Sequence, residues 1–110
     1  MYHGTSANSA AQIELGGFCP SVDGMLGRGV YLSRDISKAQ QYGAIILMCQ
    51  VSVGRVARID HQGHPLQKSW SASGFDTAWV PPRFYMVSCG LEEACISDPA
   101  KIRVLDRVRA

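Results

Sequence analysis

Apolar residues fall along the chain in short runs, and their spacing is more typical of strands than of helices. Residues 44–53 begin as an almost continuous apolar run and end in β-branched residues, which predicts a central strand buried on both faces. Residues 55–59 and 102–108 alternate apolar and polar positions, so each predicts a strand with one solvated face. Two further short strands are expected at 84–88 and at 93–97.

Helical signals are confined to the first half of the chain. Ser6 is a suitable N-cap for an alanine-rich helix over 7–15, which a pair of glycines then ends. Asp35 is a second N-cap, and apolar residues follow it at helical spacing over 36–42. Between these helices, glycines lead into a short apolar strand within 27–33. The chain therefore begins with two short helices around a strand and continues mainly as strands.

Two segments lack a regular pattern and are interpreted as loops. Residues 18–28 contain proline, aspartate and glycine, and residues 61–82 form a long irregular stretch that includes both tryptophans. Loops of this length inside a compact domain are usually functional or mobile. Within the second loop, residues 74–79 are expected to form a turn packed down by its aromatic side chains. We expect one domain over residues 1–110, of the α+β class, with mainly antiparallel sheets packed on each other.

Composition narrows the class of protein. The chain of 110 residues is 46% hydrophobic and 18% charged, which suffices for a core and is unlike a disordered chain. Its net charge of +2 is too small to indicate nucleic-acid binding, and no apolar run reaches the length of a membrane-spanning helix. Four cysteines without a CxxC pair, behind an N-terminus that lacks a signal peptide, favour reduced thiols and a cytoplasmic protein.

Two clusters of polar residues have ordinary explanations. His61 and His64 bring two imidazoles close together, but a second pair of ligands is absent nearby, so we expect no metal site. Arg103, Arg107 and Arg109 lie close together near the C-terminus. They are interpreted as the solvated face of the last strand.

Two tyrosines are the first candidate ligand-binding residues that the sequence indicates. The strand expected within 27–33 carries Tyr31, and the helix after it ends near Tyr42, so both side chains can approach one place. Aromatic rings stack well on a flat ligand, which would suit a binding site of that kind. The other interpretation is a strand-to-helix corner whose tyrosines lie in the core, and this stretch alone does not separate the two.

Five stretches of the sequence form an ordered set: His3-Gly4-Thr5, 27–33, 37–42, 48–54 and 93–102. In this order they resemble the motifs of the catalytic domain of poly(ADP-ribose) polymerases, which belong to the diphtheria-toxin-like branch of the ADP-ribosyltransferases. Each motif alone is weak, but together they cover most of the chain. Among the members of that family, the chain resembles the short, virus-inducible PARP-like proteins of fish.

The resemblance implies an NAD-binding cleft between two small antiparallel sheets, with NAD as the substrate and no separate metal or cofactor. His3 would hydrogen-bond the adenine-side ribose of NAD, and the backbone of Gly4 would bind the nicotinamide amide. Thr5 and Ser33 belong to the same motifs and are taken with them as NAD-binding residues. Ala39 stands where the family usually has a serine whose hydroxyl helps to hold the amide, and loss of such a bond costs on the order of 1 kcal/mol.

The same resemblance implies which residues surround the nicotinamide and its ribose, where the reaction takes place. Tyr31 and Tyr42 would sandwich the nicotinamide ring, and Glu93 would hydrogen-bond the nicotinamide-ribose hydroxyl and orient the acceptor. Glu92 directly precedes Glu93, and alternation along a strand sends neighbours to opposite faces, so at most one of them reaches the cleft. The match of the following residues favours Glu93, which with His3 and Tyr31 makes the expected catalytic set.

The implied function is NAD-dependent ADP-ribosyl transfer with release of nicotinamide. Short acceptor loops favour single ADP-ribose units on a protein acceptor, the enzyme itself included. The alternative is a catalytically weak or inactive module that binds NAD, ADP-ribose or partner proteins in an antiviral or stress response. A third hypothesis, an enzyme acting on nucleic-acid ends, needs arginines that grip phosphate; Arg28, Arg34 and Arg83 are available but follow no pattern. A protein acceptor is therefore expected over a nucleic acid, and no membrane partner is expected.

Overall fold

The computed structural model describes residues 1–83 and 90–109, and the strand expected at 84–88 lies outside them. In chain order the elements are β1 (Tyr2–Thr5), α1 (Ala7–Gly16), β2 (Val30–Leu32), α2 (Ile36–Gln40), β3 (Ile45–Val51), β4 (Val56–Arg58), β5 (Thr77–Val80), β6 (Glu93–Ile96), the 3₁₀ turn η1 (Pro99–Lys101) and β7 (Ile102–Arg109).

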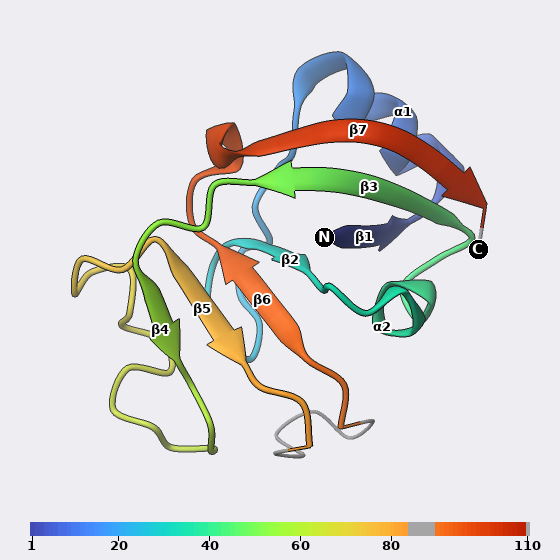
Figure 1. Cartoon of the computed structure of the whole chain (residues 1–110). Helices are drawn as coiled ribbons and strands as arrows, with labels where there is room; N and C mark the ends of the chain where they lie inside the picture. The colour runs from blue at the N-terminus through green and yellow to red at the C-terminus, as the bar shows by residue number, and fades with distance from the viewer. Residues whose placement is uncertain (84–89, 110) are drawn as a thin grey trace.

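These strands form two sheets, which Figure 1 shows one above the other. One sheet is three-stranded, in the order β1-β3-β7, and both of its strand pairs are antiparallel. The other is four-stranded, in the order β2-β6-β5-β4, and only the pairing of β4 with β5 is parallel. The expected α+β class, with two mainly antiparallel sheets and few helices, is confirmed.

A first apolar cluster joins the two sheets. It draws on α1, β2, β3 and β6, and each strand contributes every second residue because successive side chains point to opposite faces. Its buried members are Ala10, Phe18, Val30, Leu32, Ile45, Leu47, Cys49, Ala94 and Ile96. In β3, Ile46 is buried as well as Ile45 and Leu47, so the expected strand with two buried faces is confirmed in this part.

A second apolar cluster covers the other face of the four-stranded sheet. Its buried members are Leu26, Ala57, Ile59, Trp70, Ala78, Val80 and Cys95. Leu26 and Trp70 belong to the two segments without regular structure, and both side chains have almost no exposed surface. These irregular segments therefore act as the outer layer of the sheet and are not merely connections.

The helix signals in the sequence are confirmed. The Ser6 hydroxyl accepts a hydrogen bond from the N–H of Ser9 (3.1 Å), and Gly17, with φ +85°, caps the other end of α1. The Asp35 carboxylate accepts from the N–H of Ser37 (2.9 Å) at the start of α2. Local hydrogen bonding thus fixes both helix starts where the sequence predicted them.

The interpretation of residues 74–79 as a turn is wrong in its second half. Gly74 has φ +94° and does turn the chain, but Thr77–Val80 is strand β5. The sequence at β5 shows no alternation that would separate it from the irregular stretch before it, and β5 is defined by pairing with β4 on one side and β6 on the other. For the same reason the sequence pattern predicts no strand at Tyr2–Thr5, where β1 pairs with β3.

Candidate functional site

The four-stranded sheet directs Tyr31 and Glu93 to one face. Val30 and Leu32 point into the first cluster, so Tyr31 between them points to the opposite face of β2. Tyr31 lies directly across from Cys95 of β6, and Glu93, two positions before Cys95, shares the face of that residue. Alternation and register therefore bring the two side chains to the same surface.

Glu92 is directed the other way, as alternation predicts. Its carboxylate accepts hydrogen bonds from Trp79 Nε1 (2.8 Å) and from Arg34 Nε (2.7 Å). The Arg34 guanidinium also lies 5.6 Å from the centroid of the Trp79 ring. Glu92 and Glu93 are both buried, so the possibility that either is simply solvated is excluded. Glu92 has structural partners, and Glu93 is the one of the two that borders the cleft described next.

A cleft of about 420 Å³ opens on the side of Glu93. Its volume lies in the range of about 300–1,000 Å³ that is usual for small-molecule sites. It is bordered by β1, β2, the start of β6 and the residue Tyr42 after α2. Part of the loop of residues 18–28 completes the border, and we call this whole loop the cleft loop. The lining residues are His3, Gly4, Cys19, Ser21, Asp23, Gly24, Met25, Val30, Tyr31, Tyr42 and Glu93.

His3 borders this cleft as a neutral imidazole. Its Nδ1 lies 2.8 Å from the carbonyl oxygen of Tyr31, and because a carbonyl only accepts, Nδ1 carries the proton and donates. Burial lowers the pKa of His3 from its usual 6.5, and the bond to the Tyr31 carbonyl opposes this without reversing it. The ring packs edge-on against Phe18, with the centroids 5.0 Å apart. Nε2 is consequently an acceptor.

The backbone of Gly4 is directed away from β3. Cys49 donates its N–H to the carbonyl of Met1 (2.7 Å), whereas Tyr2 exchanges both of its backbone bonds with Ser33 (2.6 and 3.0 Å). In an antiparallel pair the backbone groups alternate between the two sides, so Gly4, like Tyr2, presents its N–H and C=O on the side of β2. A Cβ on Gly4 would lie 1.8 Å from the carbonyl oxygen of Ala39, so only glycine fits there.

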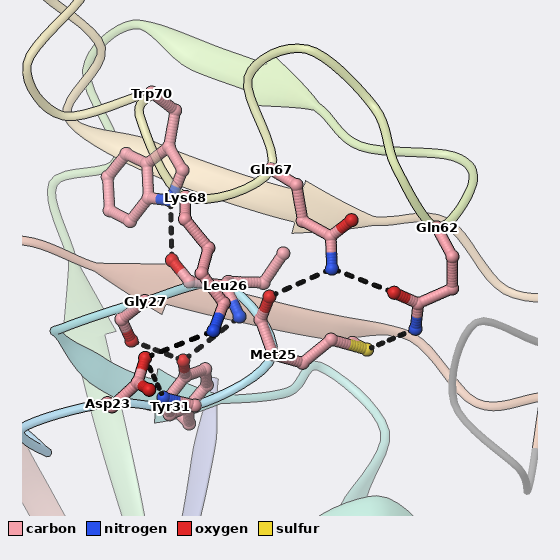
Figure 2. A network of polar contacts seen from close by, with 10 residues as sticks. Asp23, Met25, Leu26, Gly27, Tyr31, Gln62, Gln67, Lys68 and Trp70 are labelled. Carbon is pink, nitrogen blue, oxygen red and sulfur yellow. Dashed lines mark hydrogen bonds and ion pairs between the residues drawn. The ribbon is translucent and has the colours of Figure 1, made fainter.

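Tyr31 is anchored by the cleft loop, as Figure 2 shows. Its hydroxyl donates to the carbonyl of Gly27 (2.5 Å) and accepts from the N–H of Leu26 (3.2 Å). Gly24 packs so closely that an added Cβ would lie 2.4 Å from the hydroxyl oxygen. Burial raises the pKa of the Tyr31 phenol far above its usual value, so the hydroxyl keeps its proton and can donate.

Tyr42 connects the end of α2 to the buried glutamate. Its hydroxyl donates to Oε1 of Glu93 at 3.1 Å. Burial raises the pKa of Tyr42, so this hydroxyl is also protonated at neutral pH. The Nζ of Lys38 lies 5.2 Å from the centroid of the Tyr42 ring. Tyr42 therefore holds one oxygen of Glu93 while its ring faces the cleft.

Behind the cleft there is an inner cavity of only about 10 Å³. Its lining includes Gly4, Tyr31, Ser33, Ala39, Tyr42 and Glu93. A single water needs about this volume, so an aromatic ring enters only if the cavity widens. The hydroxyl of Ser33 is already bonded, since it donates to the carbonyl of Glu92 (2.8 Å) and accepts from the N–H of Asp35 (3.0 Å).

The structure brings most of the expected site residues together. His3, Gly4, Tyr31, Tyr42 and Glu93 line the large cleft, and Ser33 and Ala39 line the inner cavity. Thr5 lines neither of these two spaces; it pairs with Ile45 in the three-stranded sheet. The cleft loop adds Cys19, Ser21, Asp23, Gly24 and Met25, which the sequence did not single out. Its glycines and proline marked it as a loop, and no signal in it indicated that it folds over the cleft.

Other candidate chemistry lies away from the cleft. The rings of His61 and His64 are 5.1 Å apart, but within residues 1–83 and 90–109 no group of three metal-ligating side chains forms. Arg34 is bonded to Glu92, and Arg28 lines a different cavity beside Lys68. In the part of the chain that the structure describes, no arginine or lysine lines the large cleft. Among the residues that the structure describes, this cleft therefore lacks a set of side chains that would bind the phosphates of a nucleic-acid end.

The fold and the cleft define a small two-sheet α+β protein with a pocket of the size that binds a small molecule. Comparison with protein-family models identifies the family: the poly(ADP-ribose) polymerase catalytic domain matches over residues 1–77. Because this is more than half of the 110 residues, the chain belongs to that family, as its motifs indicated. A comparison with curated proteins finds no match.

The family match also has clear bounds. It includes His3, Gly4, Tyr31 and Tyr42, but it ends at Thr77, so Glu93 lies beyond the matched residues. It does not separate the fish proteins from other members of the family. In the described residues, no helix is both long enough and apolar enough to cross a bilayer.

Proposed function

We propose that this chain is an NAD-dependent ADP-ribosyltransferase that transfers single ADP-ribose units to protein, itself included. One observation carries the proposal: in a chain of this family, Glu93 shares a cleft with His3, Tyr31 and Tyr42. Glu93 is buried and hydrogen-bonded to Tyr42, an arrangement that fixes a carboxylate in place before a substrate arrives. Substrate positioning and charge stabilisation are the two things this reaction requires.

The nicotinamide end of NAD is assigned to the inner end of the cleft. A carboxamide carries one acceptor oxygen and an NH₂ donor, which complement the N–H and C=O that Gly4 directs to this side. The rings of Tyr31 and Tyr42 border the same space and would stack on nicotinamide once it widens. His3 Nε2, an acceptor, would receive a hydrogen bond from a hydroxyl of the distant ribose.

The chemistry then follows from the residue types. The bond between ribose C1′ and nicotinamide breaks, and nicotinamide leaves with the bonding electrons. C1′ acquires oxocarbenium character, which a fixed carboxylate stabilises in a water-poor site. In this proposal Glu93 orients the acceptor, the acceptor attacks C1′, and its proton passes to the Glu93 carboxylate. Binding energy at the two rings and at Gly4 holds the leaving group in the reactive pose.

The test compares two neighbouring glutamates. Glu93→Gln keeps the size of the side chain and removes its charge, so release of nicotinamide and labelling with ADP-ribose should fall at least about 100-fold. Glu92→Gln is the matched control, because the carboxylate of Glu92 bonds Arg34 and Trp79 and borders no part of the large cleft. Equal activity of Glu93→Gln and the wild type, both folded by circular dichroism, contradicts the catalytic role of Glu93.

A specific observation favours a second candidate, a weak or inactive module that binds NAD. Ala39 lines the inner cavity, and it offers no side-chain hydroxyl for the nicotinamide amide. Loss of one hydrogen bond weakens affinity by about 1 kcal/mol, which slows an enzyme without abolishing it. Binding of a non-hydrolysable NAD analogue by a protein that releases no nicotinamide from NAD would select this candidate over the first.

A further inference from the structure

The cleft loop is held in place by a segment about 40 residues further along the chain, as Figure 2 shows. Gln67 Nε2 donates to the carbonyl of Met25 (3.1 Å), and Trp70 Nε1 donates to the carbonyl of Leu26 (2.7 Å). Lys68 pairs with Asp23 at 3.3 Å, but both side chains are exposed, so this pair contributes little. The strong contacts are therefore those of Gln67 and Trp70.

Gln67 is the centre of this contact. Besides bonding Met25, its Nε2 donates to Oε1 of Gln62 (2.8 Å), and its Oε1 accepts from the N–H of Gly63 (2.7 Å). Gln62 in turn donates to the sulfur of Met25 at 3.4 Å. Both the carbonyl and the side chain of Met25 are thus engaged from the same segment.

The residues of the cleft loop that Gln67 and Trp70 bind are next to, or among, the residues that line the cleft. Asp23, Gly24 and Met25 line the large cleft and not the inner cavity. The next two residues, Leu26 and Gly27, bind the hydroxyl of Tyr31 through their backbone. Because Trp70 holds Leu26 separately, loss of the Gln67 bond would shift Met25 and the residues just before it, which opens the outer part of the cleft and leaves Tyr31 anchored.

We propose that Gln67 is a positioning residue for NAD, and that with Trp70 it holds the cleft loop against the part of the dinucleotide beyond nicotinamide. This rests on the proposed function, because it assigns NAD to the cleft. Gln67 does not touch the reacting atoms; it acts through Met25. Nicotinamide alone occupies the inner end, so its binding depends less on the loop than the binding of the whole dinucleotide does.

The sharpest variant is Gln67→Glu. The carboxylate keeps the size of the side chain and can still accept from Gly63, but it loses both donors to Met25 and Gln62. Gln67→Met removes the same donors without adding charge, so agreement between the two variants excludes an effect of charge. Ser69→Ala is the control: the Ser69 hydroxyl donates to the carbonyl of Pro65 (3.1 Å), a bond within the same segment that does not involve the cleft loop.

The experiment titrates a non-hydrolysable NAD analogue and nicotinamide separately into the full chain by calorimetry, with amide hydrogen exchange on the free protein. In both Gln67 variants we expect faster exchange at residues 23–25 and about fivefold weaker binding of the analogue, with nicotinamide affinity and kcat close to wild type. Trp70→Phe, which keeps most of the packing and removes the donor, should act in the same direction.

The outcomes separate the two proposals. A wild-type chain that binds no analogue overturns the proposed function and this inference with it. A wild-type chain that binds, with Gln67 variants that bind equally well or exchange no faster than Ser69→Ala, overturns the positioning role alone. Equal weakening of the analogue and nicotinamide overturns it as well, because that pattern indicates a general loss of structure.

Discussion

At the scale of single residues, His3 illustrates how an ordinary side chain acquires one fixed role. Its Nδ1–H is committed to the carbonyl of Tyr31, and burial lowers the pKa of His3 below its usual 6.5. When the pH falls below 6.5, the unfolded chain binds a proton at this position before the folded chain does. The free energy of unfolding therefore decreases as the pH falls below 6.5. Above pH 6.5 the imidazole is neutral in both states, so this difference in proton binding disappears.

The prediction is a stability difference that depends on pH. Between pH 7.5 and pH 5.5, the wild type should lose more stability than His3→Asn, which keeps an N–H donor for Tyr31 and does not titrate. One proton of difference corresponds to at most about 1.4 kcal/mol per pH unit. Urea unfolding at the two pH values measures the difference. Identical losses in both proteins would mean that His3 titrates alike in the folded and the unfolded chain.

At the scale of elements, two glycines allow the end of α2 to lie directly against β1. A Cβ on Gly4 would lie 1.8 Å from the carbonyl oxygen of Ala39, and a Cβ on Gly43 would lie 2.3 Å from that of Thr5. Both collisions are with backbone, which cannot move aside as a flexible side chain can. The close approach of β1 and α2, which brings Gly4, Ala39 and Tyr42 around the inner cavity, therefore requires glycine at both positions.

A pair of glycine substitutions tests this packing. Gly4→Ala should destabilise the protein by about 1–3 kcal/mol or more, since the added methyl group meets backbone. Gly16→Ala is the matched control, because an added Cβ there meets nothing within 4 Å and alanine favours the helix α1 by roughly 0.5–1 kcal/mol. Thermal unfolding compares the two. A Gly4→Ala protein as stable as the wild type would show that β1 and α2 are not in close contact.

The elements also show which parts of the fold a sequence reveals. Helix starts at Ser6 and Asp35 were predictable because capping is a local hydrogen bond between neighbours in sequence. The seven residues of β3 were predictable because their burial leaves a long apolar run. Strands β1 and β5 were not predicted, because neither shows a recognisable strand pattern in its own sequence and each is defined by pairing with partners far away in the chain. Structure that depends on neighbours in the sequence, such as a helix cap, can therefore be predicted from the sequence. A strand that depends on distant pairing partners cannot.

At the scale of the whole molecule, the cleft combines residues of three kinds. Those of the early motifs, such as His3 and Tyr31, were found because the family carries them at recognisable spacing. Glu93 was found because the residues that follow it match a motif of the family, and strand alternation added only that Glu92 and Glu93 could not both reach the cleft. The cleft loop and Gln67 were not found. The hydrogen bond from Gln67 to the carbonyl of Met25 joins two distant segments, and neither segment has a sequence pattern that indicates it.

Cysteine reactivity tests the location of the cleft without relying on turnover. Cys19 is exposed and lines the large cleft, whereas burial raises the pKa of Cys49 to about 11 and that of Cys95 to about 12. Since the thiolate is the reactive form, alkylation at pH 7.5 should label Cys19 and leave these two buried thiols intact until the chain is denatured. Mass spectrometry of peptides assigns each label.

The informative comparison is between ligands. A saturating non-hydrolysable NAD analogue should slow labelling of Cys19 several-fold, because in the proposed binding mode the dinucleotide would extend past the cleft loop to the side of the cleft that Cys19 lines. Nicotinamide should protect Cys19 much less, since the inner cavity to which it is assigned does not include this residue. An analogue that binds by calorimetry yet leaves the labelling rate unchanged would place the dinucleotide elsewhere on the protein. Protection by both ligands alike would instead indicate that the loop closes over nicotinamide alone, against the division of the cleft on which the role of Gln67 depends.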